Sequence, residues 1–198
     1  MPSCPEDIAV EPALEDKDYR GREARTWHAD LSRITPDHLH ALPLGFQQQL
    51  ALASGPLEVT GHYFRLKEGQ KAGSALMTLA RPHEGGHCIV NSWALGALQG
   101  AVTLADTWTA HDGKHAIILL KLTPDEKAPE PGNRWVVVGT DGRRAWIALG
   151  TPPQHHLLVP SVKLFPNGKD LYLDIQQRYV TRLRLGPDGR FIVPTPAK

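Results

Sequence analysis

A turn between two β-prone runs decides the fold: Val162-Lys163-Leu164-Phe165-Pro166-Asn167-Gly168-Lys169-Asp170-Leu171-Tyr172-Leu173-Asp174-Ile175. The same pattern at its centre, Asp or Asn, then Gly, then Lys or Arg, recurs at Asp112-Gly113-Lys114, Asp141-Gly142-Arg143 and Asp188-Gly189-Arg190. Tight hairpins favour this step, because both central residues need a positive φ, which Gly accepts freely and Asp or Asn better than most. Four such turns predict roughly eight strands in the last half of the chain.

The flanking residues support these hairpins. Apolar runs at 116–120, 135–138 and 145–149 lie beside the first two turns, and apolar and polar residues alternate from Val180 to Leu185. Alternation indicates one buried and one solvated face. Residues 57–66 and 74–80, joined by a polar loop at 67–71, predict an earlier hairpin.

Two short helices are predicted nearer the N-terminus. Thr35 and Pro36 form a typical helix start, with Thr as the N-cap and Pro at the first helical position. A second helical stretch is predicted from Leu44 to Ala53, ended by Ser54-Gly55-Pro56.

The run from Phe165 to Leu173, with the hairpin that follows it up to Phe191, resembles the blade pattern of β-propellers of the lactonase and related repeat families. The resemblance covers about 35 residues well and 108–149 loosely, and it implies a fold but no catalytic residues. We therefore expect a mainly β protein of consecutive antiparallel hairpins, arranged as a small irregular β-propeller or a β-sandwich.

Length and charge bound the function. The 198 residues suffice for one domain with its own core, and 41% hydrophobic residues with a formal net charge of +1 exclude a wholly disordered chain or a general polyanion binder. Residues 1–30 hold eight acidic and four basic residues, which predicts an acidic N-terminal arm before a single β-rich domain at 31–198. Residues 114–198 hold 13 basic and seven acidic residues, so this arm either lies over a basic face or is an unrelated solvated surface.

The chain has no apolar run long enough to span a membrane. The location is left open: periplasmic or exported if a signal peptide has been removed, otherwise cytoplasmic. Cys4 and Cys88 are either a disulfide in an exported protein or two unrelated thiols. We expect no cofactor.

One candidate metal site follows the letters H-E-x-x-H, at His83-Glu84-Gly85-Gly86-His87. In zinc metalloproteases such histidines lie one helical turn apart and bind the metal. Two consecutive glycines disfavour a helix here. A polar loop between strands is the preferred interpretation, with zinc binding by His83 and His87 as the alternative.

A second enzymatic hypothesis uses Cys88 as nucleophile and His115 as base. Residues 88–98 are compatible with a helix whose dipole would favour the thiolate, or with a buried strand and a turn. The pattern superficially resembles cell-wall amidases and peptidases, although their Asp-Cys-Ser-Gly context is absent. Burial of Cys88 in a core is the preferred interpretation.

Candidate binding residues are the tryptophans, a loop histidine and two arginines spaced two apart on one strand face: Trp108, His111, Trp135, Trp146, Arg182 and Arg184. Trp and Arg are enriched among the residues that contribute most to protein interfaces. Aromatic residues are not interleaved with the arginines and total charge is low, so nucleic acid is not the expected partner.

Because no catalytic set has a convincing context, we expect a non-catalytic protein-binding module. Its partner would be another protein, such as an enzyme or toxin that this chain blocks as an inhibitor or immunity protein. The alternative is a hydrolase that uses Cys88 with His115, or zinc at His83 and His87.

Overall fold

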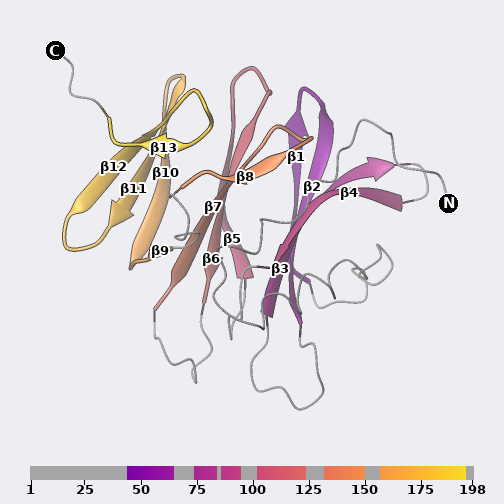
Figure 1. Cartoon of the computed structure of the whole chain (residues 1–198), viewed down its shortest axis with the longest axis horizontal. Coiled ribbons are helices and arrows are strands. Elements are labelled where there is room, and N and C mark those ends of the chain that lie inside the picture. Colours follow the sequence, from indigo (N-terminus) through magenta and orange to yellow (C-terminus); the bar gives the residue numbers. More distant parts are fainter. Residues whose placement is uncertain are drawn as a thin grey trace.

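The computed structural model describes residues 44–64, 74–83, 86–94, 102–123, 132–149 and 157–194. These residues form three antiparallel sheets that follow one another along the chain and lie side by side (Figure 1). The predicted acidic arm, the helix predicted at Thr35 and Cys4 lie outside the described residues. The prediction of a mainly β chain built from antiparallel hairpins is confirmed.

In the first sheet each strand pairs with the next. The strands are β1 (Leu44–Leu52), β2 (Gly55–Phe64), β3 (Ser74–His83) and β4 (Gly86–Ala94). The predicted hairpin between 57–66 and 74–80 is confirmed as the β2–β3 pair, in which Val59 lies opposite Leu79.

The helix predicted from Leu44 to Ala53 is wrong, because these residues form β1 and the start of a turn. Gln47, Gln48 and Gln49 are compatible with either structure, but the strand pairs with β2 along its length and buries Leu50. The helical alternative for 88–98 is also wrong over its described part, since residues up to Ala94 belong to β4.

The middle and third sheets contain the strands around the four Asx-Gly turns. The middle sheet consists of β5 (Val102–Thr109), β6 (Ala116–Leu122), β7 (Arg134–Thr140) and β8 (Ala145–Ile147), with β9 (Leu157–Leu158) also paired to β7. The third sheet consists of β10 (Ser161–Asn167), β11 (Asp170–Gln176), β12 (Val180–Leu185) and β13 (Phe191–Ile192). Eight strands flank the four turns, as predicted.

Two apolar clusters hold the sheets together, and β6 contributes to both. Ile118 and Leu120 pack with Leu57 and Leu79 of the first sheet, while Ile117 and Leu119, on the opposite face of β6, pack with the third sheet. Side chains alternate between the two faces of a strand, so an apolar run such as residues 116–120 of β6 must be buried on both faces. The middle sheet is therefore the centre of the molecule.

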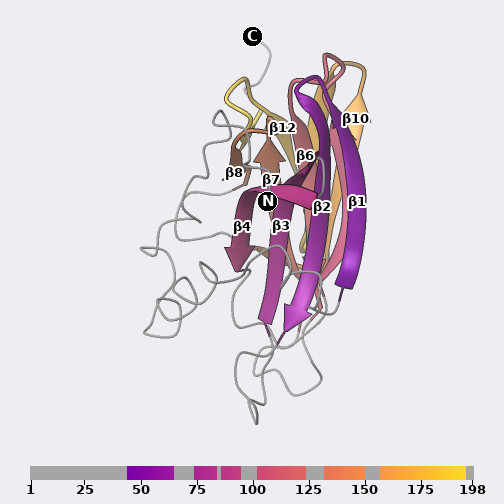
Figure 2. The same ribbon diagram turned by 90° about the vertical axis from the view of Figure 1, so that its right-hand side faces the viewer.

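The four Asx-Gly turns and the β1–β2 turn lie at one end of the sheets, toward the top of Figure 1. Hydrogen bonds join turns of different sheets there: Ala53 N donates to Gly113 O at 2.8 Å, and Ser54 Oγ donates to Asp141 O at 3.1 Å. Figure 2 shows the same sheets turned by 90°, with their strands running along a shared direction. No helix among the described residues is long and apolar enough to cross a membrane.

Candidate functional site

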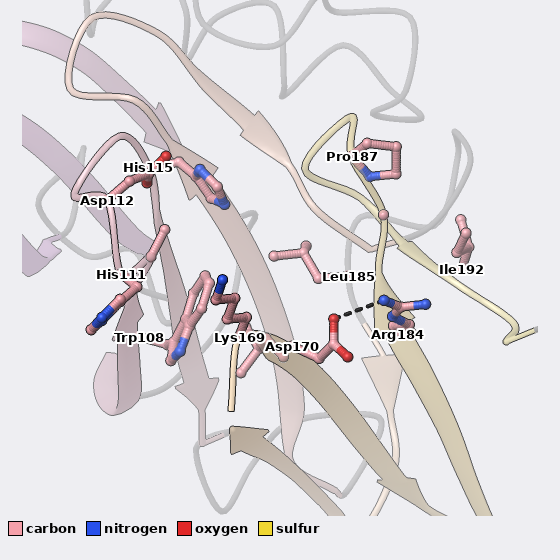
Figure 3. A pocket seen from close by; sticks show the side chains of 13 residues that line it. Trp108, His111, Asp112, His115, Lys169, Asp170, Arg184, Leu185, Pro187 and Ile192 are labelled. Atoms are coloured by element: carbon pink, nitrogen blue, oxygen red, sulfur yellow. Dashed lines mark hydrogen bonds and ion pairs between the residues drawn. The ribbon is translucent and has the colours of Figure 1, made fainter. Parts of the chain in front are cut away.

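A pocket of about 620 Å³ opens at the turn end, between the middle and third sheets (Figure 3). The β5–β6 turn contributes His111 and His115, and the hairpin from β10 to β11 contributes Lys169. Arg184 and Pro187 come from β12 and the turn after it. Three turns distant in sequence therefore build one cavity, because all three lie at the same end of the sheets.

The apolar part of the pocket is anchored on the core between these sheets. Trp108 and Leu185 line the pocket and pack against the second apolar cluster. The Trp108 ring also contacts the His115 ring, with centroids 5.8 Å apart and planes tilted by 58°. This packing restricts the Trp108 rotamer and gives the pocket a fixed aromatic surface.

Both carboxylates of the pocket already have cationic partners. Asp112 accepts a hydrogen bond from the backbone N–H of Lys114 at 3.0 Å, and the Lys114 ammonium lies 3.5 Å away. The Lys114 N–H is the main reason that the pKa of Asp112 is lowered. Asp170 accepts a 2.8 Å hydrogen bond from Arg184, which raises the pKa of that guanidinium.

The donors Lys169 and His111 are in a different position. Among the described residues, neither side chain makes a hydrogen bond or an ion pair, and both line the pocket. Figure 3 shows Lys169 beside Trp108, on the side of the pocket opposite Pro187 and Ile192. The pocket thus combines an aromatic wall with uncommitted positive charge.

The second candidate surface is the outer face of the third sheet, turned away from the middle sheet. Leu164, Leu173 and Leu183, one on each of β10, β11 and β12, point into the core. The residues next to each of them on its strand therefore point outward. We call this outward surface the Arg182 face, and its side chains are Phe165, Tyr172, Asp174, Arg182, Arg184 and Ile192.

Arg182 is held from two sides. Its Nε and Nη2 each donate a 2.6 Å hydrogen bond to Asp174, and its guanidinium lies 4.8 Å from the ring centroid of Phe165 and 5.8 Å from that of Tyr172. The hydrogen bond from Arg182 is the main cause of the lowered pKa of Asp174. A bidentate pair over aromatic rings fixes a side chain that is otherwise flexible.

Large apolar side chains are exposed on and beside this face. Phe165 is 47%, Ile192 49% and Val180 61% exposed. Arg184 and Ile192 also line the pocket, so the pocket and the Arg182 face share a border.

The structure distributes the predicted binding residues among three environments. Trp108, His111 and Arg184 meet in the pocket, and Arg182 lies on the Arg182 face. Trp135 is only 7% exposed and donates to Val159 O at 2.9 Å, while half-buried Trp146 donates to Gly189 O at 2.8 Å. These two tryptophans therefore have structural roles: Trp135 links β7 to the segment at Val159, and Trp146 links β8 to the β12–β13 turn.

Residues that sequence reasoning did not select complete both surfaces: Lys169, Phe165, Tyr172, Asp174 and Ile192. The register of the β11–β12 hairpin places Asp174 opposite Arg182. The sequence carries a signal for this pair: apolar and polar residues alternate in both strands, so counting outward from the turn between them places Asp174 opposite Arg182. The pocket has no comparable signal, because it depends on how two sheets pack.

Three residues of the alternative sites lie on strands, and the fourth, His115, lies in the β5–β6 turn. His83 ends β3, and His87 and Cys88 belong to β4, opposite Pro82 and Arg81. The two histidines are therefore on paired antiparallel strands rather than on one helix. His115 lies in the turn just before β6 of the middle sheet, whereas Cys88 lies in β4 of the first sheet. The side chains of His83, His87 and Cys88 are outside the described part, so metal binding and nucleophilic chemistry there stay predictions.

Comparisons with protein-family models, curated proteins and solved structures gave no match.

Proposed function

We propose that this chain is a non-catalytic module that binds another protein through the Arg182 face. The observation that carries the proposal is Arg182 itself, fixed by Asp174 and stacked over Phe165 and Tyr172 on an open sheet surface. Arg and aromatic residues are the types that dominate protein interfaces.

Preorganisation favours binding at this face. Ordering a rotamer-rich side chain at an interface costs about 0.5–1.5 kcal/mol, and a side chain already fixed in the free protein avoids much of that cost. The neighbouring Phe165, Val180 and Ile192 supply exposed apolar area for a partner to cover. Strands rather than loops carry these groups, so their spacing is set by the sheet.

The charge of the face indicates an acidic partner. Lys163, Arg178, Arg182 and Arg184 lie on or beside it, against Asp170 and Asp174. Both carboxylates are already paired with the two arginines of β12, which leaves Lys163 and Arg178 for a partner's Asp or Glu. We propose an enzyme or toxin with an acidic surface that this chain covers as an inhibitor or immunity protein, an extension made by analogy from the domain's size and hairpin construction.

The test is affinity capture from the native source, followed by binding measurements on the purified partner. Arg182→Glu and Phe165→Ala are expected to weaken binding at least tenfold, while Gln48→Ala, an exposed position on β1, leaves it unchanged. Wild-type affinity is expected to fall as salt is raised from about 50 to about 300 mM, because exposed charges are screened. A partner bound equally by all variants, or capture of no partner, would contradict the proposal.

We also propose that the three sheets are blades of a small irregular β-propeller rather than layers of a sandwich. Each sheet is a sequential meander, the middle sheet packs on both faces, and its first strand β5 contacts β1 and β10, the first strands of the others. Blades packed around a common axis have this order. A crystal structure in which β1, β5 and β10 do not surround one axis would refute this arrangement.

A further inference from the structure

We propose that the pocket at the turn end binds a carboxylate attached to an apolar or aromatic body. The pocket borders the Arg182 face and shares Arg184 and Ile192 with it, but the proposed ligand is different from the protein partner proposed for that face.

The size suits a small organic ligand. Pockets for such ligands usually enclose about 300–1,000 Å³, and this one encloses about 620 Å³. Trp108, Leu185, Pro187 and Ile192 give it an apolar wall, and Trp108 and Leu185 are anchored in the core. A hydrocarbon or aromatic body can therefore be buried against a surface that is already ordered.

The charges favour an anion. Each lining carboxylate is neutralised by its own cation, Asp112 by Lys114 and Asp170 by Arg184. Among the described residues Lys169 has no acidic partner, and His111 adds a ring N–H donor. Arg184 uses only its Nη2 on Asp170, so further N–H groups of the same guanidinium are available at the border of the pocket.

Other ligand classes fit less well. A metal cation needs several oxygen, nitrogen or sulfur ligands, and the described residues contain no group of three His, Cys, Asp or Glu side chains able to hold one. Lys169 would also repel it. Lys169 is exposed, so its ammonium lies at the mouth of the pocket, where a neutral polar ligand gains no ion pair and a carboxylate does.

The carboxylate has two possible sources, a free small acid or the chain end of a peptide that finishes in an apolar residue. Isothermal titration separates them with two matched pairs of probes. The first pair is 3-phenylpropionate and 3-phenylpropionamide, which differ only in the acid group. The second is a short peptide ending in Phe with a free carboxylate and the same peptide amidated.

We expect 3-phenylpropionate to bind at least tenfold more tightly than its amide, because only the acid pairs with Lys169. Lys169→Gln should remove that preference, while Lys121→Gln, on β6 and outside the pocket, should retain it. Binding should change the fluorescence of the wild-type protein, and Trp108→Phe should remove most of this change. A free-carboxylate peptide that binds more tightly than 3-phenylpropionate would identify a chain end as the source.

Equal binding of acid and amide, an unchanged preference in Lys169→Gln, or no binding of any probe at millimolar concentration would overturn the proposal. Arg182→Ala separates this site from the proposed protein-binding function. Arg182 does not line the pocket, so the variant should bind the acid normally even if it no longer binds the protein partner.

Discussion

Three aspartates of the Asx-Gly turns accept hydrogen bonds from backbone N–H groups two residues ahead: Asp112 from Lys114, Asp141 from Arg143 and Asp188 from Arg190. Only the glycines have positive φ among the described residues. The four turns were predicted correctly. The prediction assumed a positive φ at both the Asx residue and the Gly, and in the structure only the Gly has one. Asp stabilises the turn through its side chain, as in Asx-turns, and Gly alone supplies the left-handed conformation.

Gly168 and Gly189 provide a matched test of that conformation. Both have positive φ, of 60° and 76°, but a Cβ on Gly168 meets nothing within 4 Å, whereas one on Gly189 lies 2.7 Å from the Trp146 ring. We expect Gly168→Ala to cost about 1–2 kcal/mol of unfolding free energy from the backbone alone. Gly189→Ala should cost about 1–3 kcal/mol more from overpacking.

Urea unfolding followed by tryptophan fluorescence measures both variants. Gly189→Ala should also change the native emission spectrum, because Trp146 contacts that residue and donates to its carbonyl. Equal losses in the two variants would show that Trp146 moves aside without cost.

Asp174 gives the chain an acid-dependent contribution to stability. Arg182 lowers its pKa from 3.8 in the folded state, so the contribution is present above the unfolded pKa and is lost as the pH falls through the folded pKa. Asp174→Asn should therefore be slightly less stable than wild type near neutral pH, with the difference closing below about pH 4. The effect is small because the Arg182 side chain is 49% exposed and the pair is screened by water.

Denaturant titrations of both proteins from about pH 7 to about pH 2 measure this difference. Arg182→Gln should remove the same pH dependence, since it deletes the other partner. A gap between wild type and Asp174→Asn that stays constant down to the lowest pH would assign the stability to packing instead of charge.

At the scale of single elements, β1 shows where local sequence misleads. Its glutamines and leucines lack the β-branched residues that mark strands, and a helix satisfied the local pattern. Pairing with β2, from Leu44 opposite His62 to Leu52 opposite Gly55, decided the structure. The strands around the Asx-Gly turns were predictable because their turn residues and apolar flanks agree with one another.

The strand β6 has two buried faces, and neighbouring residues on it test them separately. Ile117 and Ile118 are both fully buried, but Ile117 packs toward the third sheet and Ile118 toward the first. We expect Ile117→Ala and Ile118→Ala each to lower the unfolding free energy by about 2–5 kcal/mol, since each leaves a cavity. Lys163→Ala, exposed on β10, should change it by less than about 0.5 kcal/mol.

Chemical denaturation of the three variants checks this expectation. A loss below about 1 kcal/mol in either isoleucine variant would mean that the sheet on that side collapses into the cavity or packs loosely. If only one isoleucine variant loses much unfolding free energy, the sheet interface on the other side is the more loosely packed one.

At the scale of the whole molecule, the sequence predicted hairpins but left open how their sheets pack. The pocket illustrates the reason, because Trp108 and Leu185 lie far apart in sequence and meet only through the second apolar cluster. Trp135 and Trp146 were selected as binding residues for their type, yet their indole N–H groups donate to backbone carbonyls of other segments. Such roles follow from tertiary packing, which hairpin patterns do not specify.

The three sheets should unfold as one unit. The middle sheet shares an apolar cluster with each neighbour. Backbone hydrogen bonds also join the sheets, from Ala53 to Gly113 between two turns and from Phe191 of β13 to Ala148 just after β8. Leu57→Ala in the first sheet and Leu173→Ala in the third should therefore each shift a single transition to a lower denaturant concentration. We expect each to lower the unfolding free energy by about 2–5 kcal/mol. Far-UV circular dichroism and tryptophan fluorescence should report the same midpoint in both variants, and a second transition in Leu173→Ala alone would show that the third sheet unfolds separately from the other two.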